Sequence, residues 1–383
     1  MKKLLKWLIP LISIACTVYF VPWLILRAWL APTPDTIQEQ VDKAMNYKLD
    51  GIIVYVDQGG KKPQFYSAGW KDRDKKIPAD PHSLFKIASI SKLYIAAAAS
   101  KIVARGQLSL DDTLVELLPD IADQIENSDQ ITLRMLIQHR SGIPNYSDQP
   151  NYPWDKPFTE NRPALELIYN LPGDFAPNEK YAYSNTNYLL IGEILDKTLG
   201  YSHHDYIRTE ILEPLGLKRT YSLLSEVNPD ELMSGYFIGY PLDIKGNDFI
   251  HPGGSMISTA EEVGIFLRAL NDGTLLTEKE QEIYSSVYVY EHTGLVPGYQ
   301  SIAKYHPDID AVVVQFVNTN GGYAWNLHEI VYNRVVKILG EKSGRLKSSF
   351  LYSISSQTQA KAEIGTEKGP FPNDVRSCLH QNS

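Results

Sequence analysis

The sequence predicts an α/β fold in which an antiparallel sheet is flanked by helices and interrupted by an inserted all-helical half, with one transmembrane helix at the N-terminus. Strand-like segments with alternating or continuous apolar residues occur near both ends of the globular part, and helical patterns fill the region between them. A long uncharged apolar run precedes all of them. These observations together favour one sheet layer built from both ends of the chain.

The N-terminal apolar run, residues 7–26, is long enough to cross a bilayer at about 1.5 Å per residue. Lysines precede the run and only Arg27 follows it closely, so the positive-inside rule leaves the N-terminus in the cytoplasm. A signal peptide is the alternative, but no small-x-small cleavage site follows the run. We expect residues 1–31 to form a cytoplasmic stub and a single-pass anchor, with the catalytic domain periplasmic or extracellular.

The elements of the globular part follow in order from residue 35. Two strands joined by a GGKK turn open it, an apolar helix follows, and helical patches then alternate with proline-rich loops. An amphipathic helix, a β-rich run, two more strands and a last helix complete it. The expected segments are residues 51–58 and 63–70, 85–105, 107–215, 261–273, 285–294, 299–306 and 311–322, and 325–340. We assign residues 35–342 to this domain and residues 343–383 to a polar, flexible tail.

Composition excludes several classes of function. The chain has 383 residues and a formal net charge of −8, so no basic surplus is present to attract nucleic acid. Its two cysteines, Cys16 and Cys378, lie in the least globular parts, which leaves neither a disulfide framework nor a CxxC metal site. Neither an H-E-x-x-H nor a G-x-S-x-G motif occurs. We therefore expect no metal and no cofactor.

The pair Ser89 and Lys92 forms an S-x-x-K spacing, which places both side chains on one face of a helix. The alternative is that Ser89 caps a helix and Lys92 lies on the surface. A capping box has Glu or Gln at the third position, and a cation in the first turn opposes the helix dipole. The flanking sequence is apolar, so we expect Lys92 to be desolvated, with a lowered pKa that lets it serve as a base for Ser89.

Two later stretches contain further candidate residues. Tyr183 and Asn185 come just before a helical pattern, and the sequence H-T-G begins at His292 on or beside a strand. Taken singly, Tyr183 could be a packed aromatic and His292 a strand histidine with satisfied hydrogen bonds. His139 and Ser141 are expected to frame a turn near the site.

Together these motifs resemble, in order and spacing, the three motifs of the serine β-lactamase and penicillin-binding-protein superfamily: S-x-x-K, Y-x-N and [KH]-[TS]-G. Tyrosine in the second motif resembles the class C branch and related D,D-peptidases and esterases. The resemblance implies the β-lactamase/transpeptidase-like fold. Similar blocks are IPADPHSLFKIASISK, ITLRMLIQHRSGIPNY, YAYSNTNYLLIGEILDKTLGY, HPGGSMISTAEEVGIFLRAL and HTGLVPGYQSIAKYHPDIDAVVVQFVN.

The resemblance implies three catalytic residues. Ser89 would attack a carbonyl and become acylated, while Lys92 and Tyr183 would move the proton; which of these two is the base stays open. No metal or cofactor is implied. Gly253 and Gly254 are expected to border the cleft.

The resemblance also implies a set of substrate-binding residues. Asn185 would hold the substrate amide, and His292 would keep the site electropositive. Thr293, in the same motif, would bind a carboxylate or carbonyl oxygen. Gly294 is the third residue of the motif and belongs to the same substrate-binding set. The backbone N–H groups of Leu295 and of the nucleophilic serine would form the oxyanion hole.

The implied substrate is a small peptide, amide or ester. An H-T-G third motif is similar to that of D,D-carboxypeptidases, which act on peptidoglycan stem peptides, and to that of several esterases and D-amino-acid hydrolases. Class C β-lactamases typically have K-T-G. One departure bears on this: residues 274–291 hold no arginine of the kind that relatives place there to bind a terminal carboxylate. An esterase or D-amino-acid amidase is therefore the alternative, and a slowly acylated penicillin or peptidoglycan sensor is a third.

Overall fold

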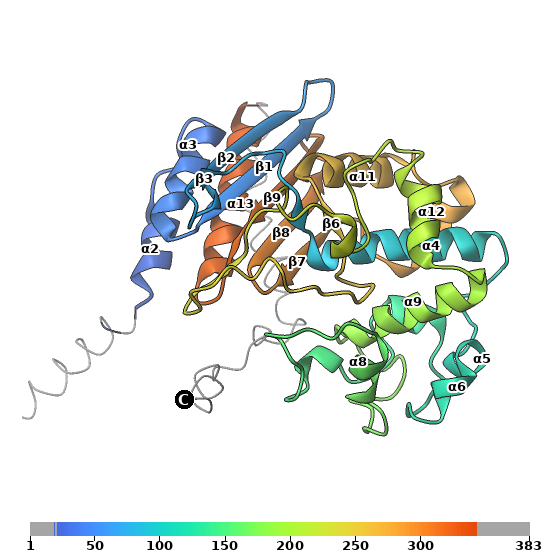
Figure 1. The fold of residues 1–383 in the computed structure, drawn as a ribbon. Coiled ribbons are helices and arrows are strands. Elements are labelled where there is room, and N and C mark those ends of the chain that lie inside the picture. Colours follow the sequence, from blue (N-terminus) through green and yellow to red (C-terminus); the bar gives the residue numbers. More distant parts are fainter. Residues whose placement is uncertain (1–18, 20, 343–383) are drawn as a thin grey trace, which may run out of the picture.

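A six-stranded antiparallel sheet in the order β3-β2-β1-β9-β8-β7 forms the centre of the fold (Figure 1). The structure, a computed structural model, describes residue 19 and residues 21–342. The hairpin from the start of the domain therefore pairs with strands from its end, as the sequence predicts. The strands are β1 (Gly51–Gln58), β2 (Gln64–Asp72), β3 (Ile77–Pro78), β7 (His292–Val296), β8 (Tyr299–His306) and β9 (Ala311–Val317).

The central strand β1 is buried on both faces. Because side chains alternate along a strand, Ile52 and Val54 pack in one apolar cluster and Ile53 and Tyr55 in another. The first cluster includes residues of helices α3 (Ile37–Ala44) and α13 (Ala324–Lys342). The second includes residues of α4 (Ser91–Ala104) and α11 (Ala260–Asp272). Helices thus cover both faces of the sheet (Figure 1).

The helical half inserted between the two groups of strands is confirmed. It lies to one side of the sheet, drawn in green in Figure 1. Its longest helix, α9, begins at Asn185 of the second motif and ends at Gly200 in a left-handed cap. Its helices are α5 (Leu114–Leu117), α6 (Pro119–Ala122), α7 (Leu133–Ile137), α8 (Arg162–Glu166), α9 (Asn185–Leu199) and α10 (His203–Ile207).

Two expectations about element boundaries are wrong. The helix expected over residues 85–105 begins only at Ser91, because the segment before it forms strand β4 (Phe85–Lys86), paired with β6 (Ile257–Ser258), and the 3-10 turn η2 (Ala88–Ile90). The β-rich run expected over residues 285–294 starts inside helix α12 (Glu278–Val287). A capping box at Thr277 fixes the start of α12, and its apolar residues are spaced for a helix.

The N-terminal segment is described only in part. Helix α2 (Trp23–Leu30) packs on α13, where the Arg334 guanidinium donates to the backbone oxygen of Trp29 at 3.2 Å. Within the residues that the structure describes, no helix is both long and apolar enough to span a membrane. The predicted transmembrane helix thus gains no support here; most of the run of residues 7–26, and the tail of residues 343–383, lie outside the described residues.

Candidate active site

Ser89 lies at the centre of the short 3-10 turn between β4 and α4. The preceding residue, Ala88, has a φ of 51°, a left-handed conformation that residues with a Cβ adopt rarely. Neighbouring contacts hold this backbone: the Ser91 hydroxyl donates to Ala88 O at 2.6 Å, and Ser301 Oγ donates to Ile87 O at 3.0 Å. A conformation that costs about 1–3 kcal/mol is thus imposed by its surroundings and fixes where Ser89 projects.

Lys92 lies one helical turn after Ser89 and is fully buried. Its Nζ donates hydrogen bonds to Ser89 Oγ at 3.2 Å, Asn185 Oδ1 at 2.9 Å and Gly253 O at 2.8 Å. Burial lowers the pKa of Lys92 to about 7. Since none of these three partners is a carboxylate, the unprotonated amine is well populated near neutral pH and can accept a proton.

Tyr183 approaches Ser89 from the helical half. Its hydroxyl donates to Ser89 Oγ at 2.7 Å, and Lys92 Nζ lies 4.9 Å from the centre of its ring. The nucleophile oxygen therefore contacts both a phenol and an amine. The protonated form of Lys92 would favour an anionic Tyr183, so the two groups can share one proton.

His139 supports Tyr183 from behind. The two rings stack at 4.5 Å between centroids with an interplanar angle of 29°. His139 is buried, which lowers its pKa well below its usual value, and its Nδ1 accepts a hydrogen bond from Ser184 N at 3.2 Å. Sequence reasoning expected only a turn here; the position of His139 depends on a left-handed backbone (φ 56°) that the sequence does not reveal.

Asn185 is the first residue of α9 and is held from several sides. Its Nδ2 donates to Ser147 Oγ at 3.0 Å, and its backbone N–H donates to Asn145 Oδ1 at 3.0 Å. With Oδ1 accepting from Lys92, the orientation of the amide group is determined. Asn185 therefore links the second motif to the first.

The third motif lies on β7, at the edge of the sheet beside the serine turn. A Cβ on Gly294 would lie 2.3 Å from Ile87 O and 3.1 Å from Ala88 Cβ, so only glycine permits this approach. Thr293 precedes it and is half-buried. β7 is an edge strand, so the N–H groups on its free side have no strand partner. The oxyanion role expected for the N–H groups of Leu295 and Ser89 stays a prediction.

His292 is a second histidine near Tyr183. Its ring centroid is 6.4 Å from that of Tyr183 and 6.0 Å from that of Tyr288. Burial lowers its pKa to about 4, so the ring is neutral at pH 7. Its Nδ1 lies 2.5 Å from Thr293 O; because a carbonyl can only accept, Nδ1 carries the proton and Nε2 is an acceptor.

The structure thus brings residues of the three motifs together: Lys92, Tyr183 and Asn185 meet through hydrogen bonds around Ser89, and β7 passes beside the same turn. Among the residues that the structure describes, no group of His, Cys, Asp or Glu could hold a metal ion. The arrangement can perform nucleophilic attack with proton transfer, which is the chemistry of a serine hydrolase.

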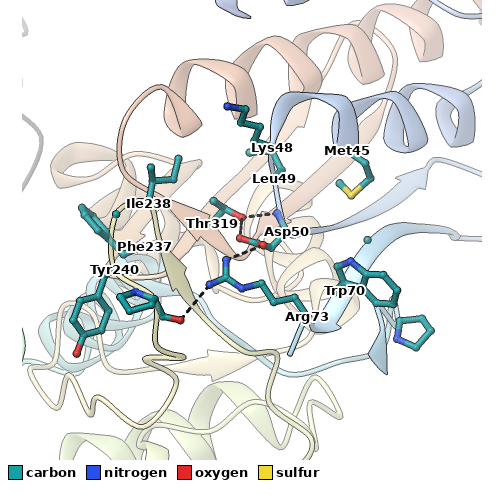
Figure 2. A pocket seen from close by; sticks show the side chains of 14 residues that line it. Met45, Lys48, Leu49, Asp50, Trp70, Arg73, Phe237, Ile238, Tyr240 and Thr319 are labelled. Atoms are coloured by element: carbon teal, nitrogen blue, oxygen red, sulfur yellow. Dashed lines mark hydrogen bonds and ion pairs between the residues drawn. The ribbon is translucent and has the colours of Figure 1, made fainter. Parts of the chain in front are cut away.

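A hollow of about 1010 Å³ lies away from these residues, and no residue of the three motifs lines it (Figure 2). It lies beside the short parallel strands β5 (Tyr236–Phe237) and β10 (Thr319–Asn320). Arg73 and Asp50, which line this hollow, form an ion pair with each other. The Arg73 guanidinium donates to Asp50 Oδ1 at 3.0 Å, and Thr319 Oγ1 donates to Asp50 Oδ2 at 2.9 Å. These contacts indicate a structural role for the pair.

Comparison with known proteins identifies the family of the chain. Residues 35–288 match the family described as Beta-lactamase, a range that includes the first two motifs and ends before β7. Penicillin-binding protein 4* of Bacillus subtilis (strain 168) is 31% identical over 209 residues, which make up 54% of this chain and 45% of that protein. The chain spans less than half the length of the curated relatives it matches.

Solved structures show the same fold. The D-amino acid amidase from Ochrobactrum anthropi SV3, complexed with L-phenylalanine amide, superposes with a TM-score of 0.71 and 23% identity, covering 80% of this chain and 98% of that one. A penicillin-binding protein from Bacillus halodurans gives a TM-score of 0.64 with 22% identity, over 78% of this chain and 98% of that one. The chain belongs to the beta-lactamase family and has the β-lactamase/transpeptidase-like fold of the serine hydrolases in that superfamily.

Proposed function

We propose that this serine hydrolase acts through an acyl-serine on Ser89 and is a D,D-carboxypeptidase-like peptidase. The observation that carries the acyl-serine is the position of Ser89 Oγ, 2.7 Å from the Tyr183 hydroxyl and 3.2 Å from Lys92 Nζ. A serine hydroxyl is a weak nucleophile on its own and needs such a neighbouring base.

In the acylation step, the Ser89 proton passes to the relay of Lys92 and Tyr183 as Oγ bonds to the substrate carbonyl carbon. The carbonyl oxygen becomes an alkoxide, which the N–H groups of Ser89 and Leu295 would stabilise. The tetrahedral intermediate then collapses, the bond to the leaving group breaks, and the relay returns the proton to the leaving nitrogen or oxygen.

In the second step, a water molecule loses a proton to the same relay and attacks the ester carbon. The bond to Ser89 Oγ breaks, Oγ recovers a proton, and the acid product leaves. Asn185 would orient the amide on the acyl side, since its own amide is fixed by Lys92 and Ser147. Each proton transfer contributes typically ~10²–10⁴ in rate.

The proposed substrate is a peptide that ends in D-Ala-D-Ala. The H-T-G motif and the similarity to a penicillin-binding protein support this choice. The apolar run of residues 7–26 and the lysines before it support the further proposal that the domain is anchored in the membrane and lies outside the cytoplasm, close to peptidoglycan. A D-amino-acid amidase is the second candidate, which the likeness to the Ochrobactrum anthropi enzyme favours.

Steady-state hydrolysis separates these candidates. The purified protein is assayed with an acyl-D-Ala-D-Ala peptide, D-phenylalaninamide and a neutral aryl ester, with Ser89→Ala as the control. Release of D-alanine as the fastest Ser89-dependent reaction supports the peptidase. Faster release of ammonia from D-phenylalaninamide would favour the amidase over the peptidase. Activity that survives Ser89→Ala would contradict the assignment of Ser89 as the nucleophile.

A further inference from the structure

A second hollow, of about 380 Å³, is lined by His292 of the third motif and by His139. The rings of His139 and His292 form part of its wall, and both lie against Tyr183. The rest of the wall comes from the segment after α7, from the end of α12 and the segment after it, and from Tyr181, which precedes α9. The Gln138 amide donates to Ser286 O at 3.0 Å and joins these two walls.

Arg140 is the only residue in this wall that is charged at neutral pH. The two histidines are neutral there, because burial lowers their pKa values, and no aspartate, glutamate or lysine lines the hollow. Within the described part of the chain, Arg140 forms no ion pair with a carboxylate. A half-buried cation at the wall of a cavity is thus left without a counter-charge.

The guanidinium of Arg140 is held in place by one neighbour. Its Nε donates to Asn178 Oδ1 at 2.7 Å and one terminal nitrogen donates to Asn178 O at 2.7 Å. The backbone N–H of Asn178 in turn donates to Arg140 O at 2.8 Å. Two donor groups are therefore used to fix the side chain, and the other terminal nitrogen is left for a ligand. Fixing the group in advance lowers the entropic cost of binding an anion.

The position of Tyr183 indicates which part of a substrate enters this hollow. The Tyr183 hydroxyl contacts Ser89 Oγ, so a leaving group that takes its proton from Tyr183 lies on the Tyr183 side of Ser89. The hollow is lined by the two histidines whose rings lie near Tyr183. It is therefore placed to receive the leaving group and not the acyl part.

We propose that this hollow is the leaving-group subsite and that Arg140 binds the terminal carboxylate of an amino-acid leaving group. The inference rests on the proposed acyl-serine chemistry and narrows its substrate to peptides with a free C-terminal carboxylate. The wall at Tyr181, Tyr288 and Val289 is largely apolar and suits a small side chain beside that carboxylate. Arg140 would thus bind the terminal carboxylate in place of an arginine in residues 274–291, which contain none.

A matched pair of substrates tests the subsite: an acyl-D-Ala-D-Ala peptide and the same peptide with its C-terminal carboxylate converted to an amide. In the full-length protein, Arg140→Gln should lower kcat/KM for the free acid by roughly 10- to 100-fold, the range for losing a hydrogen bond to a charged group. Turnover of the amidated peptide should stay within about twofold, because it offers no negative charge. Arg134→Gln on α7 is the control, since Arg134 does not line the hollow and pairs with Asp111 at 3.6 Å.

The outcomes separate this inference from the proposed function. Equal losses on both peptides would show that Arg140 only supports the fold, and no loss on either would show that the carboxylate binds elsewhere; both results overturn the subsite. A neutral aryl ester has no carboxylate in its leaving group, so its Ser89-dependent hydrolysis by Arg140→Gln reports on the acyl-serine chemistry alone. Retained ester turnover with a selective loss on the free acid supports the subsite.

Discussion

Lys92 Nζ donates a hydrogen bond to the carbonyl oxygen of Gly253, a residue 161 positions later in the chain, at 2.8 Å. This contact joins the helix that follows the nucleophile to the loop before β6. A carbonyl acceptor orients the amine without adding the negative charge that would raise the pKa of Lys92. The loop therefore positions the base and leaves it able to lose its proton near neutral pH.

The substitution Gly253→Ala tests this contact. A Cβ there would lie 2.9 Å from both Lys92 Nζ and Tyr188 Cβ, so the amine must leave its present position. We expect acylation to slow by at least about tenfold, since a small misplacement of a catalytic group is costly. Stopped-flow acylation with an aryl ester measures this. Gly254→Ala is the control, because a Cβ there meets nothing within 4 Å; equal effects of the two changes would contradict the account.

The pH dependence of acylation should report on Lys92. Its pKa is lowered to about 7, and the reactive form is the neutral amine, so kcat/KM should rise with pH through about 7 and level off above it. Two pH units below the midpoint the rate should be about 100-fold lower than the plateau. His292, with a pKa lowered to about 4, is neutral throughout this range and cannot produce the rise. A flat profile from pH 5 to pH 9 would exclude Lys92 as the titrating base.

Tyr183→Phe removes one oxygen and keeps the ring that stacks on His139. The fold should be unchanged, whereas acylation should fall by roughly 10²–10⁴, the usual contribution of a proton-transfer group. Circular dichroism and thermal unfolding check the fold, and single-turnover kinetics check the rate. If the rate falls less than about threefold, Lys92 alone moves the proton and Tyr183 only packs against the site.

His292→Lys should raise the affinity for anionic substrates. A neutral imidazole offers no charge to a carboxylate, whereas an ammonium attracts it. The added cation also lies near Lys92 and should lower the pKa of Lys92 further, which moves the midpoint of the pH profile below about 7. The KM for benzylpenicillin and the pH midpoint are the two readouts. If neither changes, His292 does not face the substrate.

Local patterns predicted much of the fold. The GGKK turn between two β-rich segments predicted the hairpin of β1 and β2, and the β-rich run of residues 311–317 predicted the strand β9. Boundaries were missed where tertiary contacts decide them: the pairing of Phe85 with Ser258 makes a strand from residues that would also suit a helix. The run before His292 contains β-branched and aromatic residues, yet the capping box at Thr277 starts a helix there.

Local sequence patterns also predicted part of the candidate site. A spacing of three residues is enough to bring Lys92 to Ser89, and the order of the motifs indicates that Tyr183 belongs with them. The contribution of Gly253 and the support from His139 were not predicted in this form. Both are long-range contacts through backbone atoms or ring faces, which no local pattern encodes.

The most direct test of the central claim is intact-protein mass spectrometry of the full chain after incubation with benzylpenicillin and, separately, with an activated aryl ester. The account predicts an acyl adduct with at least one of these reagents, located on the peptide that contains Ser89 and absent from Ser89→Ala. An adduct on another residue, or ester turnover that is unchanged in Ser89→Ala, would contradict it.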